Sequence, residues 1–151
     1  MSQDPPALSI VVPAFNEEEV LPQFHARLSA ALEGVGLVWE VVYVNDGSKD
    51  ATLPVMLGLQ AGDSRVSVLN LSRNFGKEIA LTAGLDHARG AEAVVVIDAD
   101  LQDPPELLPE MLKVMDQGVD VVYGRRETRY GDSLPKRWAC AVCSCSWAWA
   151  T

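Results

Sequence analysis

The chain has 151 residues, of which 48% are hydrophobic and 22% are charged. This composition is typical of one folded globular domain and excludes a chain that is mainly disordered, collagen-like or coiled-coil. The net charge of −9 excludes a typical nucleic-acid-binding domain, because neutralising phosphates requires a basic surface.

Charge is unevenly distributed along the chain. Residues 1–120 contain 7 basic and 19 acidic side chains, whereas residues 121–151 contain 5 basic and 2 acidic ones. An acidic region suits a bound cation, and a basic segment suits a phosphate group or an anionic lipid surface.

Apolar segments alternate with helical patterns along most of the chain. We predict strands at residues 8–12, 38–44, 66–71, 93–97 and 119–123. We predict a first helix that is capped by Asn16 and ends at Gly34, and further helices at residues 50–61, 77–88 and 105–117. Apolar strands separated by helices indicate an α/β fold, with a mostly parallel sheet and helices on both faces.

The two ends of the chain carry weaker signals. Residues 1–6 lack a cationic start and a long apolar stretch, so we see no secretory signal and expect a cytoplasmic protein. The longest uncharged run, residues 138–151, is shorter than the roughly 20 residues that span a bilayer. It holds Cys140, Cys143 and Cys145, an odd number that argues against a disulfide framework, and no fourth zinc ligand lies nearby in the sequence.

Polar side chains follow each predicted strand. They are Asn16 and Glu17, Asp46, Arg73 and Asn74, Asp98 and Asp100, and Arg125 and Arg126. Because ligands of open α/β sheets bind beyond the carboxyl ends of the strands, we expect these segments to converge on one crevice.

The sharpest of these signals is the Asp-x-Asp motif of Asp98 and Asp100. In an extended segment, residues two apart face the same way about 6.5 to 7 Å apart, so both carboxylates can face one divalent cation. Gln102 is placed to add a neutral oxygen. Hard oxygen ligands favour Mg²⁺ or Mn²⁺, and carboxylates this close also need a counter-charge.

Four motifs together resemble family 2 glycosyltransferases, and more narrowly the polyprenyl-phosphate sugar transferases such as dolichol-phosphate mannose synthase and bactoprenol glucosyltransferase. They are residues 10–17 (IVVPAFNE), 45–50 (NDGSKD), 74–78 (NFGKE) and 98–106 (DADLQDPPE). The resemblance covers residues 8 to about 138 and implies a GT-A fold that binds a nucleotide-diphosphate sugar.

The resemblance also implies roles for individual residues. The nucleotide sugar would be bound by Pro13, Phe15, Glu17, Val44, Asp46, Asp98, Ala99, Arg126 and Arg137. The metal would be held by Asp98, Asp100 and Gln102, with Asp100 and Arg126 stabilising the departing diphosphate. Lys77, at a predicted helix start, is either a phosphate contact or an exposed first-turn lysine.

The expected reaction is inverting, metal-dependent sugar transfer to a polyprenyl (undecaprenyl or dolichyl) phosphate, as in building cell-envelope glycans. An ionised lipid phosphate needs no general base, whereas a sugar hydroxyl acceptor would need a carboxylate such as Glu127 or Asp132. Two alternatives stay open: a nucleotide-sugar-binding remnant without turnover, and a family 2 transferase that acts on a sugar hydroxyl. The motifs leave the sugar and the base open, with UDP-glucose and GDP-mannose as candidates.

We expect a nucleotide-sugar-binding domain over residues 1–138 and an atypical Cys- and Trp-rich tail over residues 139–151. The resembling family continues with amphipathic and often transmembrane helices, so the tail indicates a truncation, and the full-length form is expected at the cytoplasmic face of the membrane. A phosphoacceptor receiver domain is disfavoured, because an aspartate after the third strand and a lysine after the fifth are both missing.

Overall fold

The computed structural model describes residues 5–90, 92–126 and 138–143. The chain divides into two compact units, residues 1–106 and residues 107–151, which are described separately below.

Every predicted strand and helix is present in the described residues, with boundaries that differ by a few positions. The first unit contains β1 (Leu8–Ala14), α1 (Leu21–Glu33), β2 (Trp39–Asn45), α2 (Thr52–Gly62), β3 (Val66–Asn70), α3 (Lys77–His87) and β4 (Ala93–Val96). A 3₁₀ turn, η1 (Pro105–Leu107), leads into α4 (Leu108–Met115), β5 (Val121–Arg126) and β6 (Trp138–Cys143).

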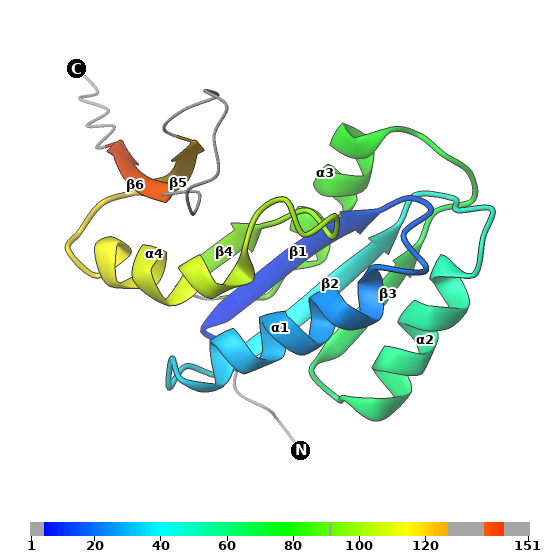
Figure 1. Ribbon diagram of the computed structural model, residues 1–151, viewed down its shortest axis with the longest axis horizontal. Coiled ribbons are helices and arrows are strands. Elements are labelled where there is room, and N and C mark those ends of the chain that lie inside the picture. Colours follow the sequence, from blue (N-terminus) through cyan, green and yellow to red (C-terminus); the bar gives the residue numbers. More distant parts are fainter. Residues whose placement is uncertain (1–4, 91, 127–137, 144–151) are drawn as a thin grey trace, which may run out of the picture. The chain divides into compact units, whose positions relative to one another are not determined.

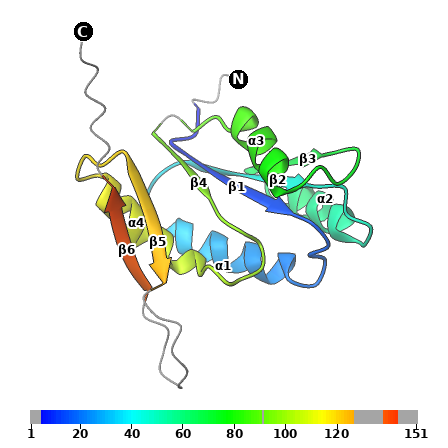
Figure 2. The ribbon, with the colours of Figure 1, turned by 90° about the horizontal axis from the view of Figure 1, so that it is seen from above.

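The first unit is built on a four-stranded parallel sheet with the strand order β3-β2-β1-β4. All residues of β1 and β2 are buried, which explains why both strands are mainly apolar on both faces. Figures 1 and 2 show α1 and α2 on one face of this sheet and α3 on the other. The predicted α/β fold with helices on both faces is therefore confirmed for this unit.

The strand order places a topological switch point between β1 and β4. From β1 the chain moves outward through β2 and β3, and α3 then carries it back across the opposite face to β4. The loops after β1 and β4 therefore follow neighbouring strands at the carboxyl edge of the sheet, which is where ligands of open α/β sheets bind.

Close packing of α3 on the sheet depends on Gly84. This glycine is buried, and a Cβ at its position would overlap the side chain of Val11 in β1 and crowd that of Val44 in β2. The contact lets the helix backbone approach both central strands.

The first helix begins later than predicted. Its cap position is Val20 rather than Asn16, and Asn16 adopts a left-handed backbone conformation with φ 57°. The Asn16 side chain accepts a hydrogen bond from the backbone N–H of Lys49 in the next loop, 2.9 Å away. A contact between loops has therefore replaced the predicted local cap.

A buried polar cluster lies at the amino ends of β1 and β2, at the edge opposite the crevice. The Glu40 carboxylate, 3% exposed, accepts hydrogen bonds from the Ser9 hydroxyl (2.6 Å) and from the backbone N–H (2.8 Å) and Nε (2.9 Å) of Arg89. Burial opposes ionisation of this carboxyl, but these hydrogen bonds outweigh it, so the Glu40 pKa lies below its usual 4.5. The cluster ties the segment after α3 to both strands.

The second unit departs from the predicted continuous sheet. Strand β5 was expected in the parallel sheet, but it pairs antiparallel with β6, from Val121 opposite Cys143 to Arg126 opposite Trp138. Residues 139–143, expected to belong to an atypical tail, form most of β6. Cys140 and Cys143 lie in this strand, and Cys145 lies outside the described residues. Within the described ranges, no helix has the length and apolar character needed to span a bilayer.

A histidine of α1 and a tyrosine of β2 form a part-buried polar pair. The hydroxyl of Tyr43, a fully buried residue, and Nδ1 of His25 share a hydrogen bond of 2.9 Å. Burial lowers the pKa of His25 below its usual 6.5; the charge of Asp63 acts in the opposite direction, and that of Arg65 adds to the lowering. Burial, followed by the charge of Asp63, raises the pKa of Tyr43. The folded protein therefore favours the neutral forms of both rings.

This pair predicts a pH dependence of stability. Because the His25 pKa is lowered on folding, the unfolded chain binds more protons below about pH 6.5, and the free energy of unfolding should fall as the pH drops from 7 to 5. Urea unfolding of His25→Gln should show a smaller loss over this range than the wild type. The matched control His87→Gln, at an exposed position in the last turn of α3, should keep the wild-type loss. Equal losses in all three proteins would contradict the assignment.

Candidate functional site

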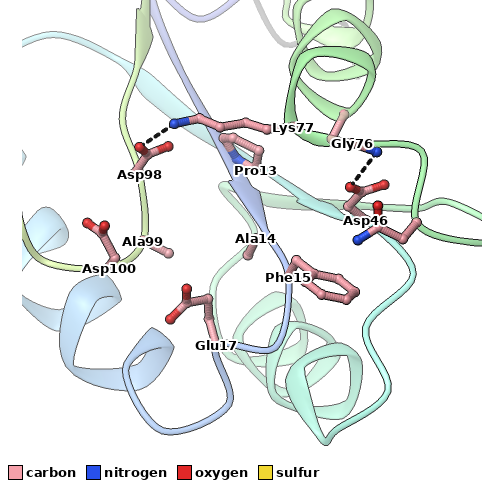
Figure 3. A pocket seen from close by; sticks show the side chains of 12 residues that line it. Pro13, Ala14, Phe15, Glu17, Asp46, Gly76, Lys77, Asp98, Ala99 and Asp100 are labelled. Carbon is pink, nitrogen blue, oxygen red and sulfur yellow. Dashed lines mark hydrogen bonds and ion pairs between the residues drawn. The ribbon is translucent and has the colours of Figure 1, made fainter.

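A pocket of about 330 Å³ opens at the switch point between β1 and β4. It is lined by residues from the ends of β1, β2 and β4 and from the start of α3: Pro13, Ala14, Phe15, Glu17, Asp46, Asn74, Gly76, Lys77, Ala80, Asp98, Ala99 and Asp100. In Figure 3, the carboxylates of Glu17, Asp98 and Asp100 lie along one side of the pocket, and Phe15 and Asp46 lie on the other.

Asp46 fixes the loop that leads into α3. Its side chain is 3% exposed, and its two carboxylate oxygens accept hydrogen bonds from the backbone N–H groups of Phe75 (2.8 Å) and Gly76 (3.0 Å). The next residue, Gly47, has φ 65° and lies so close to the backbone of Arg73 that a Cβ there would overlap it. The loops after β2 and β3 therefore form one packed wall of the pocket.

The loop after β1 is joined to the loop after β2 in the same way. The backbone N–H of Asn16 donates to the Ser48 hydroxyl at 3.0 Å, and the backbone N–H of Glu17 donates to the Thr52 hydroxyl at 2.8 Å. These bonds supply acceptors to backbone groups that regular secondary structure leaves unpaired. They hold Glu17 at the mouth of the pocket.

Neighbouring negative charges act on the Glu17 carboxylate in the pocket lining. Burial raises the pKa of Glu17 above its usual 4.5, and the negative charges of Asp100, Asp50 and Asp98 raise it further. These carboxylates are therefore close enough to disfavour the ionised form of Glu17. A cation placed among them would relieve this repulsion.

Lys77 provides the counter-charge that the Asp-x-Asp motif requires. Its Nζ lies 2.5 Å from Oδ2 of Asp98, and the two side chains are 62% and 32% exposed. This ion pair joins the first residue of α3 to the segment after β4 (Figure 3).

Asp100 lies in a turn rather than in an extended strand. Its Oδ1 accepts the backbone N–H of Gln102 at 2.9 Å, and Leu101 between them has a φ of 58°. Asp98, Ala99 and Asp100 all line the pocket, and Ala99 is buried at 2% exposure. Among the described residues, no three or more His, Cys, Asp or Glu side chains form a group that could hold a metal by themselves.

The pocket brings together most of the residues predicted for the site. Eight of them line it: Pro13, Phe15, Glu17, Asp46, Lys77, Asp98, Ala99 and Asp100. Gln102 does not line it and offers its backbone N–H to Asp100 instead. Val44 does not line it either, because its side chain is fully buried with Val42 and Ala80 beneath α3.

The remaining predictions fall on the second unit. Arg126 ends β5, and Arg137 lies outside the described residues. Conversely, Ala14, Gly76 and Ala80 line the pocket although no role was predicted for them. Gly76 lies within the NFGKE motif, and its φ of 98° falls in the left-handed region that favours glycine. The sequence alone does not reveal this backbone conformation.

Comparison with protein families gives a match over nearly the whole chain. The model described as glycosyl transferase family 2 matches residues 9–147.

Several curated proteins are similar in sequence. The bactoprenol glucosyl transferase of Shigella phage SfV is 46% identical over 130 residues, which cover 86% of this chain and 42% of the relative. The undecaprenyl-phosphate 4-deoxy-4-formamido-L-arabinose transferase of Salmonella paratyphi A is 38% identical over 136 residues, which cover 89% of this chain and 41% of the relative. The chain thus spans about two fifths of the length of these relatives.

A solved structure shares the fold. The mannosyltransferase PcManGT from Pyrobaculum calidifontis, in complex with GDP-Man and Mn²⁺, superposes with a TM-score of 0.67 at 24% sequence identity. The match covers 79% of this chain and 35% of that protein.

The double hydrogen bond of Asp46 predicts a local effect on the pocket wall. Asp46→Ala would leave two part-buried N–H groups without their acceptor and should lower the free energy of unfolding by about 1–3 kcal/mol. Amide hydrogen exchange of Phe75 and Gly76 should accelerate. The control Asp86→Ala removes an exposed carboxylate from α3 and should change stability by less than about 0.5 kcal/mol. Unchanged exchange at both amides in Asp46→Ala would refute this role.

Proposed function

The chain belongs to glycosyl transferase family 2, and from this premise we propose that it transfers a sugar from a nucleotide-diphosphate sugar to a polyprenyl phosphate, with a divalent cation at Asp98 and Asp100. The proposal rests most heavily on the pocket at the switch point, where the carboxylates at the ends of β1 and β4 meet one lysine at the start of α3.

The charges of the pocket support a cation-dependent donor site. Its lining includes four acidic side chains, Glu17, Asp46, Asp98 and Asp100, and one basic side chain, Lys77. A diphosphate is itself negatively charged, so it would be repelled by such a lining at close range. A divalent cation held by Asp98 and Asp100 would offset this repulsion by supplying positive charge to the diphosphate.

The donor set fits Mg²⁺ or Mn²⁺. Two carboxylates, those of Asp98 and Asp100, face the pocket, and carboxylate oxygen is the ligand type that these hard cations prefer. Mg²⁺ is usually held by one or two carboxylates together with substrate phosphates, so a complete cage of protein ligands is not required. When bound, the cation would act as a Lewis acid that stabilises negative charge on the departing diphosphate. Gln102 contributes here by holding the Asp100 carboxylate through its backbone N–H.

The opposite side of the pocket suits the nucleoside. Phe15 lines the pocket and is 39% exposed, so its ring has a free face for a base or ribose. Pro13 and Ala99 complete the apolar part of the lining. The Asp46 carboxylate already accepts two backbone hydrogen bonds, so we assign it the role of shaping this wall.

Two arginines are assigned to the phosphates from the family resemblance. Arg126 stands at the end of β5, and Arg137 lies outside the described residues. Guanidinium groups form charge-assisted, often bidentate hydrogen bonds with phosphate oxygens, which suits both residues to the developing charge of the leaving group.

The acceptor is inferred from the names of the relatives, which act on bactoprenol and on undecaprenyl phosphate. A lipid phosphate is ionised near neutral pH, so it can attack the anomeric carbon without a general base. Direct displacement of this kind inverts the anomeric centre. We propose that the protein meets such an acceptor at the cytoplasmic face of a membrane.

Donor binding and turnover are tested separately. Calorimetry with UDP-glucose and with GDP-mannose, each with and without Mn²⁺, should show that one donor binds and that Mn²⁺ strengthens its binding. Transfer of radiolabelled sugar to a short polyprenyl phosphate should then report activity. Binding without transfer would support a nucleotide-sugar-binding remnant, and absence of binding by a broad panel of donors would refute the proposal.

The metal assignment predicts the effect of one substitution. Asp100→Asn keeps the size of the side chain but removes a cation ligand, so transfer should fall on the order of 100-fold or more and the Mn²⁺-dependent part of donor binding should disappear. Addition of EDTA to the wild type should have the same effect. The control Glu92→Gln, at an exposed position beside the amino end of β4, should behave like the wild type. Full transfer by Asp100→Asn would contradict the metal role.

A further inference from the structure

Lys77 and Asp98 form an ion pair within the pocket lining. The ammonium of Lys77 lies 2.5 Å from one oxygen of Asp98, and both residues line the cavity. In the described part of the chain, Lys77 is the one basic residue in the lining. The carboxylate proposed to hold a cation is therefore already paired with a positive charge that belongs to the protein.

This pairing is readily exchanged. The side chain of Lys77 is 62% exposed, and an ion pair in contact with water contributes little stability because water competes for both charges. Lysine is also a point charge on a flexible four-carbon chain, so its ammonium can move several ångströms without any change in the backbone. The backbone at the root of this side chain is fixed, because Asp46 holds the N–H of Gly76.

We propose that Lys77 is an exchangeable counter-ion: it neutralises Asp98 in the ligand-free protein and moves to the diphosphate of the donor when the divalent cation takes over Asp98. This inference rests on the proposed function, since it assumes a donor with a diphosphate. Its consequence is that the cation alone binds weakly, because it must first displace Lys77. Donor and cation then favour each other's binding, because each releases one partner of the same ion pair.

The first test measures Mn²⁺ binding in the absence of nucleotide. The electron paramagnetic resonance signal of free Mn²⁺ should show weak binding to the wild type and binding at least about threefold tighter to Lys77→Met, which loses the competing charge. Lys77→Arg, which can still pair with Asp98, should stay close to the wild type. Lys49→Met is the matched control: it removes the same charge from a residue that is exposed and does not line the pocket, and it should leave Mn²⁺ affinity unchanged.

The second test measures nucleotide binding in the absence of metal, with UDP and GDP as probes. Lys77→Met should bind the nucleotide that the wild type prefers several-fold more weakly, because the diphosphate loses its partner from the protein. Lys77→Arg should retain most of this affinity.

The outcomes separate the two proposals. Tighter Mn²⁺ binding together with weaker metal-free nucleotide binding in Lys77→Met supports the exchange. Unchanged or weaker Mn²⁺ binding in Lys77→Met overturns it, as does unchanged nucleotide affinity. A wild-type protein that binds neither these nucleotides nor any of a broad panel of nucleotide sugars, with or without Mn²⁺, overturns the proposed function, whereas the Mn²⁺ measurement still decides whether Lys77 competes for Asp98.

Discussion

Negative charge concentrated along one pocket is the constraint on which the site depends, and the four carboxylates in its lining have different surroundings. Asp46 accepts two backbone N–H groups from the loop before α3, and Asp98 is paired with Lys77. Asp100 accepts a backbone N–H from two residues further along the chain. The pKa of Glu17 is raised, first by burial and then by the charges of its acidic neighbours. Three of these carboxylates therefore have a hydrogen-bonding or ionic partner, whereas the pKa of the fourth, Glu17, is raised by its surroundings.

The compensating partners differ in how firmly they are held. The loops after β1, β2 and β3 are joined by hydrogen bonds that involve backbone groups, as at Asn16 and Asp46. Asp98 is joined to α3 through the ends of two side chains, one of them long and mostly exposed. The pocket therefore combines a preformed wall with an adjustable one. A preformed wall reduces the ordering cost of binding, and an adjustable one allows charge to be redistributed when ligands arrive.

The sequence predicted features that depend on nearby residues, and it missed features that depend on contacts with distant segments of the chain. Apolar runs and helical spacing predicted the order of the elements, and strand-end carboxylates predicted the location of the pocket. Asn16 was wrongly predicted as a helix cap because the competing partner, the N–H of Lys49, lies in another loop. The role of Val44 in the base pocket stays a prediction; the structure shows that it is buried against Ala80 of α3 and does not line the pocket. The pairing of β5 with residues 138–143 likewise depends on a partner that propensity does not encode.

The polar cluster of Ser9, Glu40 and Arg89 affects the register in which β1 pairs with β2. The middle of β1 and of β2 is aliphatic on both faces, so hydrophobic alternation alone would tolerate a slip of one strand along the other. Ser9 lies directly opposite Glu40 in the observed alignment. A slip by one residue would separate them and leave a buried charge short of acceptable partners. One solvent-excluded glutamate therefore selects a single pairing among several that the hydrocarbon core would accept.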